Sequence, residues 1–362
     1  MYLATLTVTH FRNIAQADLA LSPGINILVG ENGAGKTALL EAIHLLARGR
    51  SFRTPHAKQL ICHDQSELLV RGEVASGAMR HSLARSKSST GANEARIDSH
   101  PVNRQSRYAE LLPLQTLLPG VADLVLDGPA IRREFIDWGL FHVEPNYLVS
   151  AQRFRKALTQ RAVWLKTSPS SDFARDPWVE TLAATAAEIN IWRRRFVDAL
   201  DTQLHQTLGR MQADFSCDLR YHGSGFSTEE MLEQLGGSYE RDKQYATTHV
   251  GPHRADVDVR VNGIPAKTIV SRGQAKLIAS AITLSYSAEL GKRSSVQPIL
   301  LLDDFGAELD EYHRERFFSE LQVMGCQVIA TTTDQPEHLL GISSLDTARV
   351  FHVEHGSVTQ NS

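Results

Sequence analysis

The spacing of hydrophobic positions divides the chain into three regions. From Tyr2 to about Leu118 the pattern favours short strands. The strands predicted there are Leu3–Val8, Asn26–Val29, Leu68–Val74, Arg80–Arg85 and Leu114–Leu118. One helix interrupts them over Lys36–Ala47, whose apolar positions keep a helical period. The basic, serine-rich stretch Ser82–Thr90 is expected to be a mobile loop or a sheet edge.

The middle of the chain, from roughly Gly128 to Leu235, has a helical pattern. Its best segments are Arg153–Lys166 and Trp178–Leu208. The second carries a nearly continuous apolar seam, with Arg193 as the exception. Such a seam is more typical of an intramolecular bundle than of a coiled-coil dimer, which is the alternative.

Strands return after about Gly251. The elements predicted there are the strand Asp256–Val261, the turn Asn262–Gly263, the helix Ser271–Leu290, the strands Ile299–Leu302 and Gln327–Thr331, and a terminal hairpin over Val350–Gly356. The fully apolar run Ile299–Leu302 suits a parallel strand covered on both faces. We therefore predict an α/β fold in which 1–127 and 245–362 form one lobe and 128–244 forms a second, helical lobe.

Composition excludes several classes of protein. Of 362 residues, 42% are hydrophobic and 22% are charged, and no run reaches the roughly eighteen apolar residues that span a bilayer. Three widely separated cysteines form neither a metal pattern nor a disulfide framework, so we expect a soluble protein of the cytoplasm. The net charge of −3 means that any DNA contact must come from local basic patches.

One stretch fits the pattern G-x-x-x-x-G-K-[ST]. Its residues are Gly30, Glu31, Asn32, Gly33, Ala34, Gly35, Lys36 and Thr37. The stretch follows an apolar strand and opens a helix, as a phosphate-binding loop requires. Backbone N–H groups at the helix start would face phosphate oxygens, Lys36 would neutralise the β- and γ-phosphates, and the Thr37 hydroxyl would bind Mg²⁺. A loop that binds no phosphate is the disfavoured alternative.

Two carboxylates follow the apolar strand Ile299–Leu302. Asp303 is placed to hold Mg²⁺, and Asp304 to polarise the attacking water. A buried strand that ends in a solvated acidic turn is the alternative, and the phosphate-binding loop makes it less favoured. The long separation between Lys36 and Asp303 exceeds what a small GTPase or nucleotide kinase needs, so the helical region is a large insertion.

Three further segments fit the motifs of ABC-type ATPases. The first, Ser271-Arg272-Gly273-Gln274, starts a predicted helix shortly before the acidic strand. Ser271 alone would be explained as a helix cap. In ABC-type ATPases, however, an S-x-G-Q element binds the γ-phosphate of ATP held by the other subunit, through a serine hydroxyl and a helix N-terminus. The sequence therefore predicts an ATP-dependent homodimer.

The other two motifs are a segment just after the acidic pair and a glutamine far before it. Ala307-Glu308-Leu309-Asp310 is positioned like the D-loop that crosses a dimer interface. Gln115 fits the glutamine that senses Mg²⁺ and water, with a polar residue at a strand edge as the alternative. Many ABC proteins carry a switch histidine after the next strand, where this chain has Thr331-Thr332-Thr333-Asp334.

With these motifs in place, the chain resembles the RecF family, which is related to the SMC proteins. The segments that carry the resemblance are Phe11-Arg12-Asn13, Leu39–Ile43, Arg132–Gly139, Gly251–Asp256, Ser271–Gln274, Asp303–Phe305 and Glu308–Asp310. The resemblance covers essentially the whole chain. It implies an ABC/SMC-type ATPase head with a P-loop lobe, a mixed sheet, an inserted helical lobe and no long coiled coil.

The resemblance also implies a function in DNA repair. ATP with Mg²⁺ would drive dimerisation on DNA, slow DNA-stimulated hydrolysis would act as a timer for release, and the protein would help RecO and RecR load RecA at single-stranded gaps. It would act in recombinational repair, replication restart and the SOS response. Arg12 would touch the nucleotide phosphates, with an exposed hairpin arginine as the alternative. Gly120 departs from the family, in which an acidic residue is common at this position. Asp304 agrees with the RecF family but is shorter than the glutamate of most ABC ATPases, which predicts slow turnover.

Basic residues of the helical region are the candidates for DNA contact. They are Arg132, Arg133, Arg153, Arg155, Lys156 and Arg161. Such residues would neutralise phosphates without reading bases, so binding should be sequence-independent and sensitive to salt. The alternative is a solvated helix face with internal ion pairs.

Two other functions share part of the pattern. An energy-coupling subunit of a membrane transporter would carry the same ATP motifs, but usually has shorter spacings and the switch histidine. A monomeric small-molecule kinase would have no use for Ser271–Gln274. Both are disfavoured.

Overall fold

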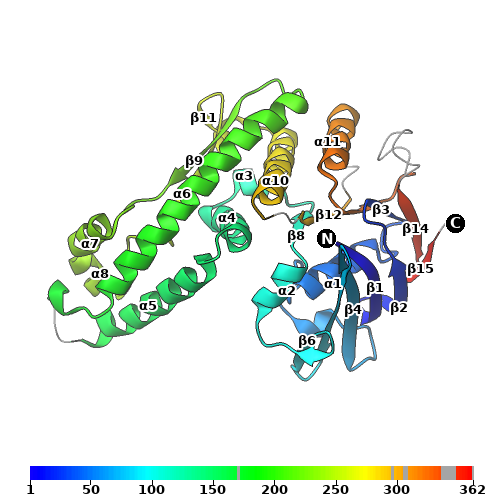
Figure 1. Ribbon diagram of the computed structural model, residues 1–362, viewed down its shortest axis with the longest axis horizontal. Helices are drawn as coiled ribbons and strands as arrows, with labels where there is room; N and C mark the ends of the chain where they lie inside the picture. Colours follow the sequence, from blue (N-terminus) through cyan, green and yellow to red (C-terminus); the bar gives the residue numbers. More distant parts are fainter. Residues whose placement is uncertain (169–171, 295–296, 305–308, 336–347, 361–362) are drawn as a thin grey trace. The chain divides into compact units, whose positions relative to one another are not determined.

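The computed structural model describes residues 1–168, 172–294, 297–304, 309–335 and 348–360. It divides into two compact units (Figure 1). Unit 1 comprises Met1–Ala122 and Arg272–Ser362, and unit 2 is Asp123–Ser271. The sequence placed the second boundary at residue 245, whereas the structure places it after Ser271. The reason is that the strand Asp256–Val261 pairs with Cys217–His222 of unit 2.

The first sheet of unit 1 is antiparallel, in the order β2-β1-β4-β5-β6-β7. Its strands are β1 (Tyr2–Phe11), β2 (Ile14–Ala20), β4 (Glu67–Ser76), β5 (Met79–Ser88), β6 (Asn93–Ile97) and β7 (His100–Pro101). The prediction of a mobile loop over Ser82–Thr90 was wrong, because β5 covers most of this stretch and pairs with a strand on each side.

The second sheet of unit 1 has the order β15-β14-β3-β13-β12-β8. Its strands are β3 (Ile25–Val29), β8 (Leu114–Leu117), β12 (Ile299–Leu302), β13 (Val328–Thr332), β14 (Arg349–Glu354) and β15 (Ser357–Gln360). All neighbours are parallel except the hairpin β14–β15, which confirms the predicted terminal hairpin. The carboxyl ends of β3, β12 and β13 therefore lie at one edge of the sheet, where ligands of parallel sheets bind.

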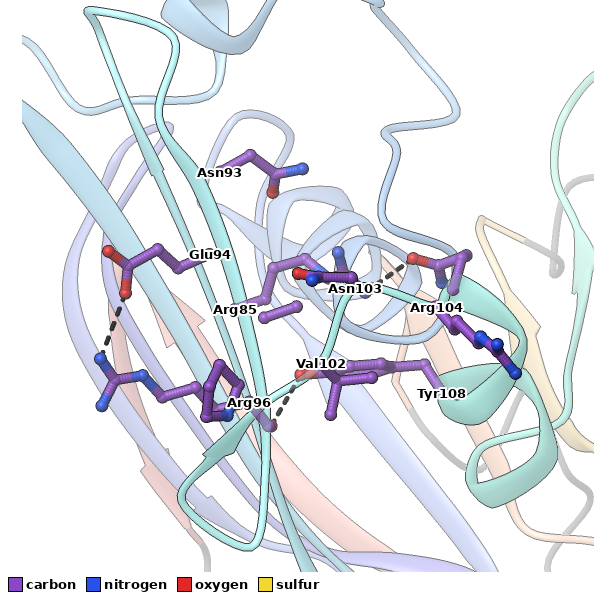
Figure 2. Close-up of a pocket in the computed structure, with 11 residues that line it drawn as sticks. Arg85, Asn93, Glu94, Arg96, Val102, Asn103, Arg104 and Tyr108 are labelled. Atoms are coloured by element: carbon purple, nitrogen blue, oxygen red, sulfur yellow. Dashed lines mark hydrogen bonds and ion pairs between the residues drawn. The ribbon is translucent and has the colours of Figure 1, made fainter.

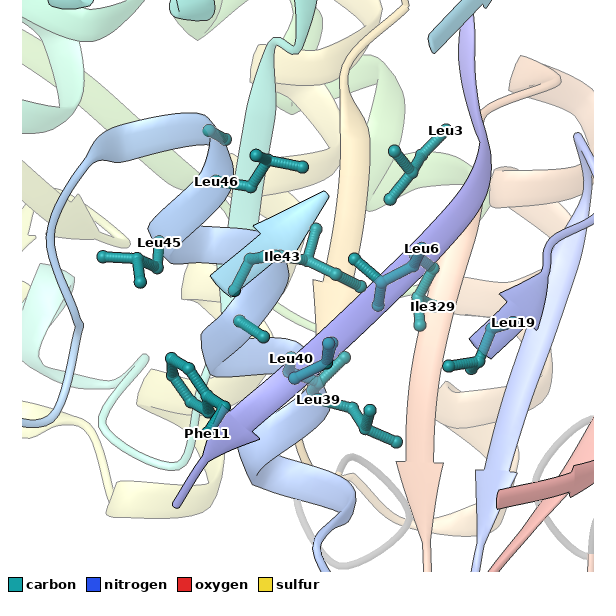
Figure 3. Close-up of a cluster of buried hydrophobic side chains, with 14 of the residues drawn as sticks. Leu3, Leu6, Phe11, Leu19, Leu39, Leu40, Ile43, Leu45, Leu46 and Ile329 are labelled. Carbon is teal, nitrogen blue, oxygen red and sulfur yellow. The ribbon is translucent and has the colours of Figure 1, made fainter. Parts of the chain in front are cut away.

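Helix α1 (Lys36–Arg48) packs its apolar side chains against both sheets (Figure 3). Its leucines and Ile43 join Leu6 of β1 and Ile329 of β13 in one buried cluster. Burial of this stripe fixes the helix, and hence the loop before it, relative to the two sheets. The other helical segments of unit 1 are η1 (Ala57–Gln59), α2 (Gln105–Leu111), α10 (Arg272–Ser294) and α11 (Glu311–Met324).

Unit 2 combines helices with a small antiparallel sheet, β11-β10-β9. Its helical segments are α3 (Asp123–Leu126), α4 (Pro129–Val143), α5 (Tyr147–Thr167), η2 (Phe173–Arg175), α6 (Val179–Arg210), α7 (Thr228–Gly237), α8 (Tyr239–Tyr245) and α9 (Ala266–Ile269). Its strands are β9 (Cys217–His222), β10 (Asp256–Val261) and β11 (Ile264–Pro265). In the described part of the chain, no helix is both long and apolar enough to span a membrane.

The apolar seam of α6 is buried inside unit 2, as expected for an intramolecular bundle. The helix packs against α5 and β9 (Figure 1). The interruption at Arg193 also has a structural cause. Its guanidinium binds both carboxylate oxygens of Asp137, at 2.8 Å each, and the carbonyl of Pro252.

A second buried arginine joins three parts of unit 2. Arg161 of α5 is 0% exposed and donates hydrogen bonds to Asp176 at 2.7 Å and to Asp242 of α8 at 2.6 Å. Asp242 in turn accepts from the backbone N–H of His249 at 3.0 Å. Removing the cation would leave two buried carboxylates without their counter-charge.

We expect Arg161→Leu to lower the free energy of unfolding by about 3–5 kcal/mol, because a buried ion pair that loses one partner leaves an uncompensated charge. The matched control is Arg155→Leu, an exposed position on the same helix, which should change stability by no more than about 0.5 kcal/mol. Urea unfolding followed by circular dichroism measures both. Equal, small losses in the two variants would contradict the role of Arg161.

Candidate nucleotide-binding site

The loop between β3 and α1 can form only with glycine at three of its positions. A Cβ on Gly30 would lie 2.1 Å from the carbonyl oxygen of Val353 in β14. Gly33 and Gly35 have φ values of +82° and +119°, which side chains disfavour. The glycines of the motif therefore allow the loop to adopt its backbone conformation, and they also leave its N–H groups accessible to a ligand.

Two residues far apart in the sequence hold this loop from outside. Asn13, in the turn between β1 and β2, donates from Nδ2 to the carbonyl of Gly33 at 3.0 Å. Gly356, in the turn between β14 and β15, donates from its backbone N–H to the carbonyl of Ala34 at 2.8 Å. A Cβ on Gly356 would lie 2.2 Å from the carbonyl oxygen of Asn13, so this position also requires glycine. The sequence motif gave no sign of this support.

Lys36 lies against its own loop. Its side chain is largely buried, and Nζ donates to the carbonyls of Gly30 at 2.6 Å and Glu31 at 2.9 Å. Burial lowers the pKa of Lys36, and the negative charges of Asp304 and Asp303 oppose this shift. The ammonium is thus positioned to exchange two weak carbonyl partners for phosphate oxygens, which carry full charge.

Asp303 meets Thr37 at the edge of the parallel sheet. The hydroxyls of Thr37 and Thr331 each donate to Oδ1 of Asp303 at 2.9 Å. Asp303 is 5% exposed. Hydroxyl and carboxylate oxygens are ligands that Mg²⁺ prefers, so this pair fits the metal site predicted for Thr37 and Asp303. Thr331 is an additional residue of the site, which the sequence analysis treated only as a missing histidine.

Asp304 has an unusual backbone conformation. Its φ is +50°, a value that is strained for a residue other than glycine. Its backbone N–H donates to the hydroxyl of Thr331 at 2.8 Å, which helps to hold this conformation. The turn brings Asp304 to the same cavity as Lys36.

These side chains surround a cavity of ≈ 550 Å³, within the range of small-molecule sites. The lining residues are Arg12, Asn13, Asn32, Gly33, Gly35, Lys36, Thr37, Ala38, Arg53, Gln59, Ile61, Asp303, Asp304 and Thr331. Of these, Lys36, Thr37, Asp303 and Asp304 were predicted from separate motifs, and the structure brings them together.

Arg12 reaches the cavity from the β1–β2 turn. Its guanidinium binds both carboxylate oxygens of Glu41 of α1, at 2.9 and 2.8 Å, and the carbonyl of Gln59 at 2.8 Å. Glu41 is fully buried. The pair fixes the orientation of Arg12 at the rim of the cavity, next to the predicted phosphate position.

The S-x-G-Q segment lies where α10 begins. Ser271, Arg272, Gly273 and Gln274 are all exposed. The D-loop prediction falls partly outside the described residues, which omit Ala307 and Glu308. Leu309 is buried, and Asp310 caps α11 by accepting a hydrogen bond from the N–H of His313 at 2.9 Å.

The assignment of Gln115 was wrong. Gln115 is the second of the four residues of β8 and is only 5% exposed. It lies opposite Leu300 inside the sheet, whereas the strand reaches the level of Asp303 at Leu117, whose carbonyl accepts from Asp303 N–H at 3.0 Å. Because Gln115 stops short of the carboxyl edge, it does not line the cavity.

The candidates for DNA contact divide into buried and exposed residues. Arg132 and Arg161 were wrongly assigned, because both are buried and neutralise aspartates of unit 2. Arg132 binds both carboxylate oxygens of Asp256 at 2.9 Å. Arg133 is partly buried and donates to the carbonyl of Ala255. Exposed cations remain on α5, namely Arg153, Arg155 and Lys156.

Comparison with known proteins agrees with this geometry. A family model described as the RecF/RecN/SMC N terminal domain matches residues 2–358. The chain is 37% identical over 364 residues to the DNA replication and repair protein RecF of Pseudomonas aeruginosa (strain LESB58), covering 100% of this chain and 98% of that protein. It is also 37% identical over 361 residues to the protein of the same name from Pseudomonas fluorescens (strain Pf0-1), covering 99% and 98%.

Solved structures give the same result. The recombination mediator protein RecF with ATP in the RecFOR pathway matches with a TM-score of 0.87 at 25% identity, over 100% of this chain and 98% of that one. An Smc head domain with a coiled coil and joint from Pyrococcus yayanosii matches with a TM-score of 0.62 at 13% identity, over 100% and 97%, which is a likeness of fold alone. The predicted SMC-type head is confirmed, and the chain belongs to the RecF family of the RecF/RecN/SMC proteins.

Proposed function

We propose that this chain is an ATP-dependent DNA-binding protein of gap and recombinational repair, in which ATP joins two copies on DNA. The observation that carries the proposal is the meeting of Lys36, Thr37 and Asp303 at the start of α1. These residues supply an ammonium, a hydroxyl and a carboxylate at the positive end of a helix. Such an arrangement suits a nucleoside triphosphate with its metal.

In the proposed site, the chain holds ATP by its phosphates. The backbone of Gly33–Lys36 and the Lys36 ammonium would bind the phosphate oxygens, and Arg12 would approach from the rim. Thr37 and Asp303 would hold Mg²⁺, which supplies positive charge against the phosphates. Asp304 would orient the attacking water. Its carboxylate is shorter than that of glutamate, which favours slow hydrolysis suited to a timer.

The exposed start of α10 is the proposed contact with the second copy. A serine hydroxyl, a glycine backbone and a helix N-terminus are together suited to an anion. The side chains of Ser271 and Gln274 are exposed to solvent. In the dimer, this segment would cap the γ-phosphate bound to the partner's P-loop, and 307–310 would cross the interface.

DNA binding is proposed for the exposed cations Arg153, Arg155 and Lys156 of α5. They would contact phosphates without reading sequence. The relatives named as RecF, one of them solved in the RecFOR pathway, favour RecO and RecR as partners and RecA loading at single-stranded gaps as the outcome. Replication restart, the SOS response and a cytoplasmic location belong to the same proposal.

The dimer is tested by sizing the protein by light scattering, with and without ATP. Wild type should dimerise with ATP, whereas Lys36→Met and Ser271→Arg should stay monomeric. Only Ser271→Arg should keep ATP binding, because its own P-loop is intact. Thr268→Arg adds the same charge at an exposed position three residues earlier and should still dimerise. A dimer of Ser271→Arg with ATP would exclude the proposed interface.

The role of Arg12 is tested without leaving Glu41 unpaired. We expect the double variant Arg12→Met, Glu41→Gln to bind ATP about 10- to 100-fold more weakly, since a hydrogen bond to a charged group contributes about 1.5–3 kcal/mol. Glu41→Gln alone should bind within about threefold of wild type, because Arg12 is retained. Calorimetric titration with ATP gives both constants. Equal affinities in the two variants would show that Arg12 only stabilises the fold.

The DNA contact is tested by salt dependence. Changing Arg153, Arg155 and Lys156 to glutamine should weaken DNA binding at all sequences and reduce the slope of log K against log salt by about 2–3, because each lost phosphate contact removes about one released counterion. The control changes three exposed cations of unit 1, Lys58, Arg80 and Arg107, to glutamine. Fluorescence anisotropy with labelled DNA measures the slopes, and equal slopes in the two triple variants would eliminate this face.

A further inference from the structure

Unit 1 contains a second cavity that shares no lining residue with the first. Its volume is ≈ 520 Å³, and it lies among β5, β6, β7 and α2 (Figure 2). The residues that line it are Arg85, Asn93, Glu94, Ala95, Arg96, Pro101, Val102, Asn103, Arg104, Gln105 and Tyr108. None of the ATPase motifs uses these residues.

A buried arginine forms one wall of this cavity. Arg85 of β5 is 3% exposed, and its guanidinium lies 4.4 Å from the centre of the Tyr108 ring. Its Nη2 donates to Oε1 of Gln105 at 2.8 Å. Gln105 is itself held, because its amide donates to the carbonyl of Ala47 at 2.7 Å. The guanidinium is therefore fixed in place before any ligand arrives.

Arg85 has no counter-ion within the described part of the chain. No carboxylate there pairs with it, and its Nε is buried without a hydrogen-bond partner. The C-terminal end of α1 lies close to it, since a Cβ on the C-cap residue Gly49 would be 3.0 Å from Nη1 of Arg85. A helix end carries only about half a charge, so it does not replace an anion. Burial accordingly lowers the pKa of Arg85.

Two further cations lie near Arg85. Lys87 does not line the cavity, but it is two residues along β5 and so on the same face of the strand as Arg85. It is half-buried, and its pKa is lowered by burial and then by the charge of Arg85. Arg104 is exposed and precedes α2. In the described chain, neither forms an ion pair with a carboxylate.

Glu94 of β6 is the one acidic residue that lines the cavity, and its carboxylate is already paired with an arginine on the opposite face of the sheet from Arg85. Glu94 binds Arg96 at 3.3 Å. Both lie opposite residues of β5 that flank Arg85, namely Ser86 and Ala84, so their side chains leave the sheet on the opposite side from Arg85. Figure 2 shows Glu94 and Arg96 on one side of the strand and Arg85 on the other.

We propose that this cavity binds the phosphate group of a small phosphate-bearing molecule, with Arg85 as its main ligand, Arg104 as a second cation of the lining and Lys87 as a nearby positive charge. A guanidinium with free donors matches phosphate oxygens, and a bound dianion would supply the missing counter-charge. The volume is that of a small-molecule site. Because Arg85 lies almost entirely below the surface, a free phosphate or a mononucleotide reaches it more readily than the backbone of a DNA duplex.

The experiment uses the full chain with Lys36→Met, so that the P-loop does not bind the probe. Inorganic phosphate, pyrophosphate and AMP are titrated at constant ionic strength, with chloride as the reference, by calorimetry and by thermal unfolding. We expect at least one of the three to bind and to raise the unfolding temperature. Adding Arg85→Met should weaken that binding at least about tenfold, the effect of losing one charged hydrogen bond.

A structural role for Arg85 makes a different prediction. In phosphate-free buffer, Arg85→Met should unfold at the same temperature as its parent or higher, since it removes an unpaired buried charge. A purely structural arginine would give a lower temperature. Arg104→Gln should weaken binding about threefold by removing one exposed charge, and the matched Arg107→Gln, an exposed position within α2 and outside the cavity, should not change it.

Four results would overturn the proposal. One is the absence of binding by all three probes. Another is equal affinity in the Arg85→Met and parent proteins, and a third is equal affinity in the Arg104→Gln and Arg107→Gln proteins. The last is an unphosphorylated single-stranded oligonucleotide that loses affinity with Arg85→Met while the small anions do not bind, which would assign the cavity to a nucleic-acid backbone instead.

Discussion

The buried carboxylate of Asp303 connects three segments of unit 1. Asp303 directly follows β12, and its carboxylate accepts one hydrogen bond from the hydroxyl of Thr37 at the start of α1 and another from the hydroxyl of Thr331 in β13. A buried charge of this kind requires such donors, and they come from segments nearly three hundred residues apart. The parallel register of β3, β13 and β12 makes the meeting possible, because it brings three strand ends to one edge. The two halves of the candidate nucleotide site are thus parts of one sheet.

Part of this arrangement could be predicted from the sequence, because local patterns determined it. The limits of β12 match those of the predicted strand. A strand that is buried on both faces is a continuous apolar run, so its first and last residues can be read from the sequence. The glycine-rich loop was also predictable, because Gly33 and Gly35 are required by their own backbone angles. The requirement for Gly30 comes instead from the distant carbonyl of Val353. The support of this loop by Asn13 and Gly356 was not predictable, because the contact depends on the register of two hairpins at opposite ends of the chain.

The errors concern polar side chains whose surroundings are set by tertiary structure. Arg161 and Arg132 were assigned to the surface by their charge, yet each lies beside aspartates supplied by distant segments. Gln115 was assigned to the nucleotide site because the pattern of the predicted strand Leu114–Leu118 does not show how β8 is aligned with β12. Conversely, Arg85 and Lys87 made part of β5 resemble a basic loop, although β5 lies between two other strands. Because arginine and lysine are almost never fully buried unless they are paired, the pattern assigned these residues to the surface.

The contact between the P-loop and the β14–β15 turn has a consequence for biosynthesis. Val353 and Gly356 lie against Gly30 and Ala34, so the loop is complete only when residues near position 356 have been translated. A nascent chain still held in the ribosome would possess the whole glycine-rich motif and yet lack the contacts that residues 353 and 356 make with it. The loop therefore acquires its complete support only near the end of translation.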